Sequence, residues 1–139
     1  MTQTAVVKEI LPGGRAAVER YWDELADAYL GSTLARLAAE RGVEGCWEYW
    51  REALAAESSD ARLEYDPRAD VFTIDMRHCP SKGRLLDRQA ADGFAPYSGY
   101  CDHCPHMYRR VLEPMGIAFD MDMSECDRAR CRIRIYRRR

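Results

Sequence analysis

The sequence predicts an α+β fold in which a helical N-terminal half packs on a small, mostly antiparallel four-stranded sheet. Two patterns support this prediction. Apolar residues recur at helical spacing through the first part of the chain, whereas short segments in the second part alternate strictly between apolar and polar residues. The alternating segments, which we expect to be the strands, are residues 61–65, 71–76, 117–123 and 131–136.

The chain of 139 residues has the length of one domain. We therefore expect a single domain over residues 1–139, with a helical part over 1–60 and a sheet part over 61–139. Three helices fit the first part. Gly31 is the stop signal of the first helix and Gly42 that of the second, because glycine is the usual residue just past a helix end.

Two further helices are expected between the strands of the second part, over residues 82–91 and 105–115. Pro105 fits the first position of the later helix, where its missing N–H costs nothing. Apolar residues recur at helical spacing in this segment, and Gly116 follows as its stop. All the helices are expected to cover one face of the sheet.

The arginine-rich C-terminal end has a structural explanation in the last two strands. If residues 124–130 connect them, a simple antiparallel register places Asp122 opposite Arg132 and Asp120 opposite Arg134. Opposite charges that face each other across two strands favour such a register. These arginines therefore do not require a polyanionic partner.

Composition excludes several classes of function. The net charge of −2 gives no global support for nucleic-acid binding. No apolar run approaches the roughly 18 residues that a membrane span needs. The first ten residues lack the basic start and apolar stretch of a signal peptide. We expect a cytoplasmic protein that binds a small-molecule substrate, with no nucleic acid and no membrane as partner; a homodimer is compatible with these observations.

Cysteine and histidine usage is the most informative feature of the chain. A reducing compartment disfavours a disulfide framework, so the cysteines are expected to be metal ligands, reactive thiols or buried apolar residues. All three histidines lie beside cysteines: His78 precedes Cys79, His103 precedes Cys104, and His106 follows two residues later. The six cysteines are Cys46, which we assign to the helical core, and Cys79, Cys101, Cys104, Cys126 and Cys131, which lie at the ends of predicted elements.

The first hypothesis for these residues is nucleophilic catalysis. A histidine or a helix N-terminus beside a thiol increases its thiolate fraction. Cys104 has both candidates nearby, namely His103 or His106 and the start of the helix expected at 105. Adjacent residues do not necessarily touch, so Cys79 with His106 and Cys104 with His78 are alternative pairs. This hypothesis requires no cofactor.

The second and third hypotheses are a zinc site and a redox pair. Zinc would take four ligands from the five cysteines at element ends and the three histidines. The set that we select is Cys79, Cys101, Cys104 and Cys126, of which the C-x-x-C of Cys101 and Cys104 is one pair with suitable spacing. Such a site would be structural or bind a partner, whereas three ligands and an open position would make a catalytic zinc. A second pair of equally short spacing is missing, because four residues separate Cys126 from Cys131. A redox C-x-x-C should follow a strand in a βαβ unit, which the predicted antiparallel fold does not supply.

Three segments carry a resemblance to a known family. The strand Val71-Phe72-Thr73-Ile74-Asp75-Met76 runs into Cys79-Pro80, Tyr100-Cys101-Asp102-His103-Cys104 precedes a helix, and Cys131-Arg132-Ile133-Arg134-Ile135 forms a final strand. With the helical half before them, these segments resemble the L-2-amino-thiazoline-4-carboxylic acid hydrolase-like family. The resemblance implies a hydrolase-like biosynthetic enzyme that opens a 2-aminothiazoline ring or a related amidine-type sulfur and nitrogen metabolite.

The mechanism that follows is a hypothesis built on these residues. A thiolate of Cys104 or Cys79, with Cys101 as a further candidate, attacks an amidine-like or thioester-like carbon, and His103, His106 or His78 transfers protons. Backbone N–H groups near residue 105 stabilise the developing negative charge. The residues expected to bind the substrate and its carboxylate are Arg77, Arg84, Arg109 and Tyr100.

Overall fold

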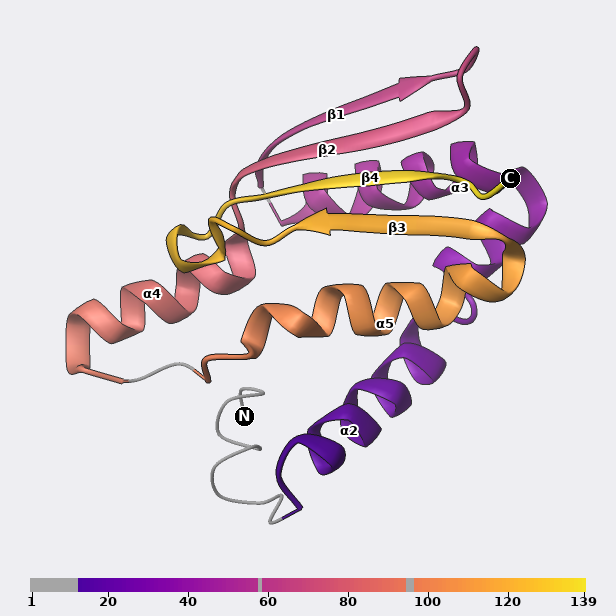
Figure 1. Cartoon of the computed structure of the whole chain (residues 1–139). Helices are drawn as coiled ribbons and strands as arrows, with labels where there is room; N and C mark the ends of the chain where they lie inside the picture. Colours follow the sequence, from indigo (N-terminus) through magenta and orange to yellow (C-terminus); the bar gives the residue numbers. More distant parts are fainter. Residues whose placement is uncertain (1–12, 58, 95–96) are drawn as a thin grey trace.

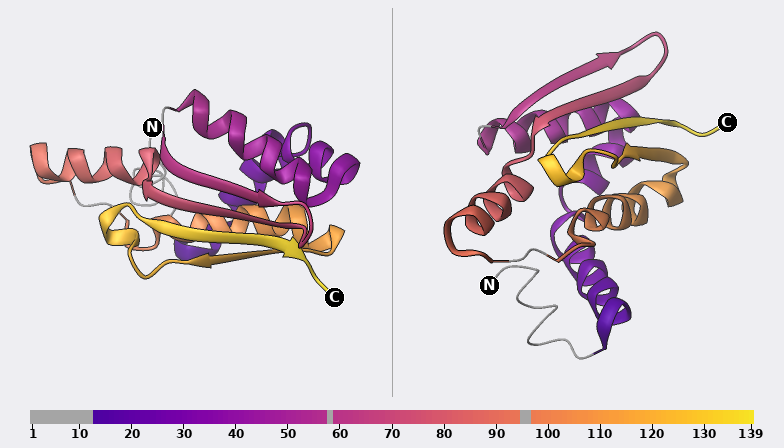
Figure 2. Two further views of the ribbon diagram at one scale, coloured as in Figure 1. Left: turned by 90° about the horizontal axis from the view of Figure 1, so that it is seen from above. Right: turned by 60° about the vertical axis from the view of Figure 1, so that its left-hand side comes forward.

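The structure is a computed structural model that describes residues 13–57, 59–94 and 97–139. It confirms the predicted α+β fold: helices cover one face of a four-stranded antiparallel sheet, and no described element covers its other face, which we call the open face (Figures 1 and 2). The first ten residues, on which the expected compartment depends, lie outside the described residues. Within the described ranges, no helix combines the length and apolar character that crossing a membrane requires.

Within residues 13–57, the N-terminal half consists of two helices, α2 (Gly14–Tyr29) and α3 (Leu34–Ala56). The sequence predicts a stop at Gly42, and there the backbone does leave the helical region, with φ 63° and ψ −136°. Helical conformation then resumes, so that the second and third predicted helices follow each other across a kink in α3. Only glycine adopts this backbone conformation without steric cost.

The sheet is built from two hairpins whose strands come together in the order β1-β2-β4-β3, with every neighbouring pair antiparallel. Each strand alternates residues between the helix-covered face and the open face, as its sequence pattern predicts. The strands are β1 (Asp60–Asp66), β2 (Val71–His78), β3 (Ile117–Asp122) and β4 (Cys131–Arg137).

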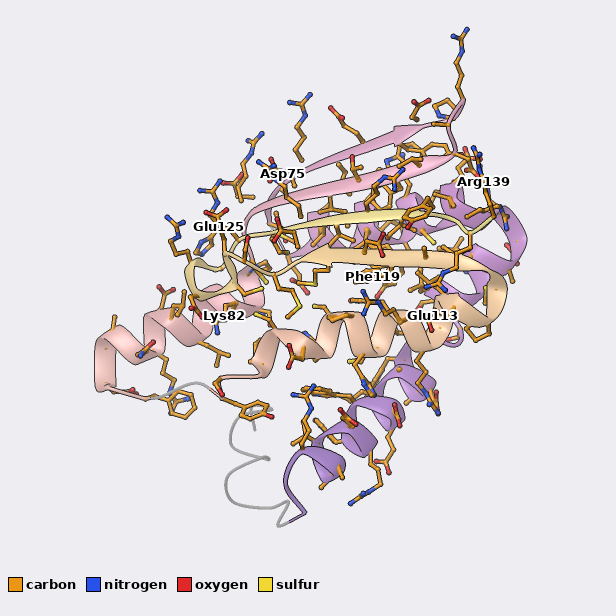
Figure 3. The ribbon with its side chains drawn as sticks, viewed as in Figure 1. Asp75, Lys82, Glu113, Phe119, Glu125 and Arg139 are labelled. Atoms are coloured by element: carbon orange, nitrogen blue, oxygen red, sulfur yellow. The ribbon has the colours of Figure 1, made fainter. Side chains whose placement is uncertain are left out.

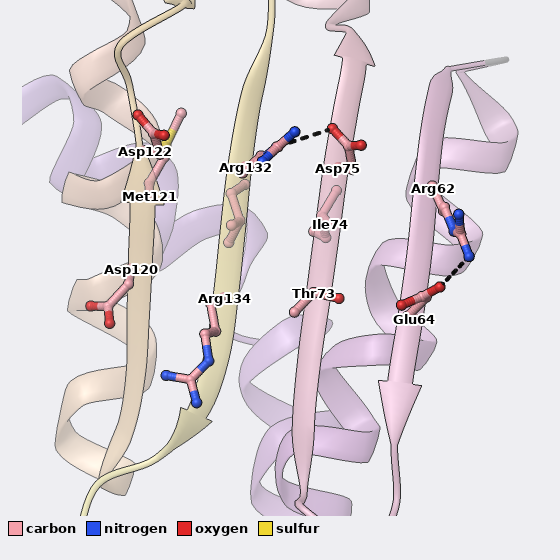
Figure 4. A pocket seen from close by; sticks show the side chains of 11 residues that line it. Arg62, Glu64, Thr73, Ile74, Asp75, Asp120, Met121, Asp122, Arg132 and Arg134 are labelled. Carbon is pink, nitrogen blue, oxygen red and sulfur yellow. Dashed lines mark ion pairs between the residues drawn. The ribbon is translucent and has the colours of Figure 1, made fainter.

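The predicted register of the last two strands is confirmed. Asp122 lies opposite Arg132, and Asp120 lies opposite Arg134. The arginines also interact along the sheet: the Arg132 guanidinium lies 3.8 Å from the carboxylate of Asp75 on the central strand β2 (Figure 4). The open face therefore carries a mixed set of positive and negative side chains, which accounts for the arginine-rich end of the chain.

Three short turns of 3-10 helix and two α-helices complete the part of the fold that the structure describes. The helices are α4 (Pro80–Asp92) and α5 (His103–Leu112), and the turns are η2 (Tyr100–Asp102), η3 (Glu113–Met115) and η4 (Cys126–Arg128). The predicted start of α5 at residue 105 is wrong by two residues, because η2 continues directly into the helix. Pro105 is still tolerated there, since the amides of a first turn have no acceptor within their own helix.

The core lies between the sheet and the helices α3 and α5. Trp50 of α3 is at its centre, with its ring centroid 4.8 Å from that of Tyr108 and 6.1 Å from those of Phe72 and Phe119. Cys46 is fully buried in the same cluster, as expected. The helix α4 extends beyond the end of the sheet (Figure 2), so that only its first turn lies against that end.

Candidate active site

A cavity of about 250 Å³ lies where the end of β2, the starts of α4 and α5 and the turn before β4 meet the last turns of α3. Five of the six cysteines line it, together with aromatic side chains from α3 and α5 and several polar groups. The lining thiols are Cys79, Cys101, Cys104, Cys126 and Cys131.

The ends of secondary-structure elements bring these thiols together. Cys79 is the residue before α4, and Cys131 opens β4. The backbone N–H of Cys79 donates to the Ala129 carbonyl at 2.7 Å, which joins the start of α4 to the turn that carries Cys126. Since β2 and β4 are neighbouring antiparallel strands, the end of one lies beside the start of the other.

The central pair in the cavity is Cys104 with His103. The Cys104 sulfur lies 3.4 Å from Nε2 of His103, and Nδ1 of the same ring lies 2.5 Å from the Tyr100 carbonyl oxygen. A carbonyl only accepts, so Nδ1 carries the proton and donates it. In the neutral ring Nε2 is then the free acceptor, and it faces the thiol.

Burial sets the protonation of this pair. It raises the pKa of Cys104 to about 12 and lowers the pKa of His103 below its usual 6.5. At pH 7 the pair is therefore a neutral thiol beside a neutral imidazole. Burial also raises the pKa of Cys131 to about 12 and the pKa values of the remaining cavity thiols, which are Cys79, Cys101 and Cys126.

Two opposite effects act on the pKa of the Cys79 thiol. Burial raises its pKa, whereas the backbone amides of Ser81 and Lys82, in the first turn of α4, lower it. These amides therefore face the cavity end of the Cys79 side chain. They form a set of N–H groups beside the cavity at the N-terminus of α4, whereas the sequence suggested the helix that starts near residue 105.

Cys101 does not pair with Cys104, its partner in the C-x-x-C. Its thiol contacts Cys126 of η4 instead, and this contact raises the pKa of Cys101 and lowers that of Cys126. The four thiols proposed as zinc ligands all line the cavity. However, no three His, Cys, Asp or Glu side chains of the described residues converge closely enough to hold a metal ion.

The structure separates the three histidines. His103 lines the cavity, whereas the exposed ring of His78 lies against Gly83 on the outer side of α4. His106 points toward α2, where its Nε2 lies 2.7 Å from a carboxylate oxygen of Asp23. The alternative pairs of Cys79 with His106 and of Cys104 with His78 are therefore not formed.

The three arginines expected to hold a substrate carboxylate also lie outside the cavity. Arg77 is exposed and lies 4.0 Å from Asp60, and Arg84 is exposed on α4. Arg109 donates its Nε–H to the Phe119 carbonyl at 2.9 Å, which ties α5 to β3. Of the expected substrate-binding residues, Tyr100 does line the cavity, and its hydroxyl bonds to that of Ser81.

Sequence reasoning missed one prominent residue of the cavity, Lys82. It lies in the first turn of α4 and is only 6% exposed (Figure 3). One signal was present in the sequence: a lysine in the first turn of a helix adds positive charge where the helix dipole disfavours it. Tyr108 and Cys131 also line the cavity.

Comparison of the chain with protein-family models, with curated proteins and with solved structures gives no match.

Proposed function

We propose that this protein is a small cysteine-dependent enzyme with hydrolase-like chemistry, in which Cys104 is the nucleophile and His103 its general base. One observation supports this proposal above the others: the thiol lies 3.4 Å from Nε2 of the imidazole at a cavity wall. The Tyr100 carbonyl holds the ring in the tautomer whose Nε2 accepts a proton. Nucleophile, base and orienting group are the parts that covalent catalysis requires.

The first half of the reaction starts from the neutral pair. Because burial raises the pKa of Cys104 to about 12, free thiolate is scarce at pH 7 and attack must be coupled to proton transfer. The Cys104 sulfur bonds to an amidine-type carbon while its proton moves to Nε2 of His103. The electron pair of the C=N bond moves onto nitrogen, which then takes that proton from His103.

The second half releases the product. The nitrogen that remains re-forms its C=N bond as a carbon–nitrogen or carbon–sulfur bond breaks, and the proton that this nitrogen gives up passes to the leaving amine or thiol. The carbon stays bound to Cys104. Water then adds across the C=N bond and leaves one proton on nitrogen; as the C=O bond forms and the bond to Cys104 breaks, the other proton passes through His103 to the Cys104 sulfur. The amides of Ser81 and Lys82 are better placed than those near Pro105 to stabilise the negative charge that develops, since proline has no N–H.

The proposed substrate class is an amidine or thiazoline-type sulfur and nitrogen metabolite. Support for it comes from the sequence resemblance described above and from the size of the cavity, which suits a molecule of one small ring. Aromatic side chains of Trp50 and Tyr108 provide an apolar wall for such a ring.

Turnover of 2-amino-thiazoline-4-carboxylate, followed by chromatography and mass spectrometry, tests the proposal. Cys104→Ala should abolish turnover, whereas Cys131→Ala, which removes another buried thiol of the same cavity, should retain most of it. Iodoacetamide labelling gives a readout that does not depend on this substrate, and it should modify Cys104 in the wild type before Cys131. Full activity in Cys104→Ala would refute the proposed role of this thiol.

A zinc-binding domain is the alternative, and the same preparation tests it. If zinc holds the four cavity thiols Cys79, Cys101, Cys104 and Cys126, protein purified without a histidine tag will contain about one equivalent of metal and a chelator will unfold it. The nucleophile proposal predicts instead that chelator leaves turnover and thermal melting unchanged.

A further inference from the structure

Lys82 has an environment that is unusual for a charged side chain. It is 6% exposed and lines the cavity. Within the part of the chain that the structure describes, its ammonium has neither an ion-pair partner nor a hydrogen-bond acceptor. The ammonium itself keeps some contact with solvent, since among the described residues Ser59 Oγ is the one unpartnered side-chain N or O atom that is fully shielded. A ligand in the cavity can therefore pair with a cation that has no protein partner among the described residues.

The surroundings of Lys82 do not neutralise it. Its positive charge lowers the pKa values of Cys101 and Cys126, so the ammonium lies near both thiols. Burial nevertheless keeps both pKa values above the ordinary one, and the thiols are uncharged at pH 7. Asp127 lies beside Lys82 in a neighbouring surface hollow, but the two form no ion pair within the described residues.

The charged side chains that line the cavity add up to a net positive charge. Lys82 and Arg130 contribute two positive charges and Glu57 contributes one negative charge, and of these Arg130 and Glu57 are both exposed. The amides at the start of α4 add positive potential at the same end. The other lining groups are thiols, the Ser81 hydroxyl, the neutral His103 ring and apolar or aromatic side chains, and none of them carries a charge at pH 7.

We propose that the cavity binds a small organic anion and that Lys82 determines this specificity. The anionic group, a carboxylate or another singly charged oxyanion, forms an ion pair with the Lys82 ammonium, and the apolar body of the ligand packs against Trp50 and Tyr108. This assignment names the substrate class of the proposed enzyme, and it replaces the three arginines that the sequence suggested for the same role.

Binding of benzoate and benzamide, measured by thermal-shift titration, tests the assignment. The two probes share shape and size, and only benzoate carries a negative charge. We expect benzoate to bind the wild type at least about tenfold more tightly, as a charge-assisted contact predicts. Lys82→Met should abolish this preference. Without ligand its melting temperature should stay close to that of the wild type, because the ammonium that it removes keeps contact with solvent and has no partner among the described residues.

Arg84→Met is the matched control, since it removes an exposed cation two residues away on the same helix, and it should keep the benzoate preference. If Lys82→Met does not fold, the binding of benzoate and benzamide is compared in Lys82→Gln instead. Equal binding of the two probes to the wild type overturns the proposal, and so does a preference that survives the loss of Lys82. A Lys82→Met variant that melts well below the wild type assigns Lys82 a structural role and also overturns it.

This test is independent of catalysis. Cys104→Ala should retain the benzoate preference, because the thiol contributes no charge to the empty cavity at pH 7. A protein that prefers benzoate but turns over no thiazoline would refute the proposed reaction and leave the anion site standing. Turnover by a protein that binds both probes equally would support the proposed reaction and refute the anion site.

Discussion

The sulfur of Cys104 lies 3.4 Å from Nε2 of His103, although the two residues are adjacent on one helix. Neighbouring side chains on a helix diverge by about 100°, so such a contact needs a cause. The cause is the preceding turn: the Tyr100 carbonyl holds Nδ1 of His103 at 2.5 Å and tilts the ring across the first turn of α5. A backbone group therefore orients the base.

The first prediction concerns the rate at which Cys104 reacts. In His103→Gln the thiol keeps its burial but loses its base, so labelling by iodoacetamide at pH 7 should slow by about 10²-fold, the lower end of what a general base contributes. Peptide mass spectrometry over a time course measures the rate at each cysteine separately.

Cys131 is the internal control for this experiment. Burial raises its pKa to about 12, the same value as for Cys104, and no histidine contact accompanies it among the described residues. Its labelling should be slow in both proteins and unaffected by the substitution. Equal labelling of Cys104 in the two proteins would show that the 3.4 Å contact does not activate the thiol.

The second prediction is a dependence of stability on pH. Burial lowers the pKa of His103 below 6.5 in the folded protein, so between the two values the unfolded chain binds a proton that the folded chain does not. Stability is therefore lost as the pH falls from about 6.5 toward the folded pKa, and it is retained above 6.5. Melting temperatures of the wild type and of His103→Gln between pH 7.5 and 5 measure the effect.

The His103 contribution appears as the difference between the two proteins. The wild type should lose more stability than His103→Gln over this interval, while acidic groups common to both contribute equally. Parallel melting curves across the whole interval would contradict the lowered pKa of His103. A variant that loses more stability than the wild type would contradict it as well.

The fold was largely predictable because its strand signals are regular. Side chains alternate with a period of two along a strand, so Phe119 and Ile133 had to face the core once Asp120 and Arg132 were placed outside. The same regularity explains why the cavity thiols could be anticipated as a group. Cysteines at strand ends and helix starts converge wherever those ends meet at one edge of a sheet.

The roles of individual side chains were less predictable. His103 and His106 are three residues apart and therefore lie on neighbouring parts of one helix surface, so spacing alone favours neither. Packing of α2 against α5 decides between them, because it brings Asp23 to His106 and leaves His103 at the cavity. The local sequence does not determine such contacts between distant segments. The position of Lys82 in the cavity was not predicted for the same reason.

The third prediction concerns oxidation. The Cys101 thiol contacts that of Cys126, so diamide, which accepts two electrons and two protons from a thiol pair, should join these two sulfurs. The C-x-x-C motif alone would predict a Cys101–Cys104 bond instead. Mass spectrometry of non-reduced peptides distinguishes the two products, and Cys104→Ala should still form the cross-link. A disulfide between Cys101 and Cys104 as the main product would contradict the observed contact.

The last prediction tests the kink in α3. At Gly42, φ is 63° and ψ −136°, a backbone conformation that is strained for any residue with a Cβ atom; the added atom would also meet the Arg137 guanidinium, whose flexible end can move aside. Gly42→Ala should therefore cost about 3 kcal/mol of unfolding free energy, measured by urea denaturation. Gly116→Asn is the control, because this glycine has an ordinary left-handed conformation with open space around it; its cost should stay within about 1 kcal/mol. Equal costs would mean that the kink is not strained for other residues.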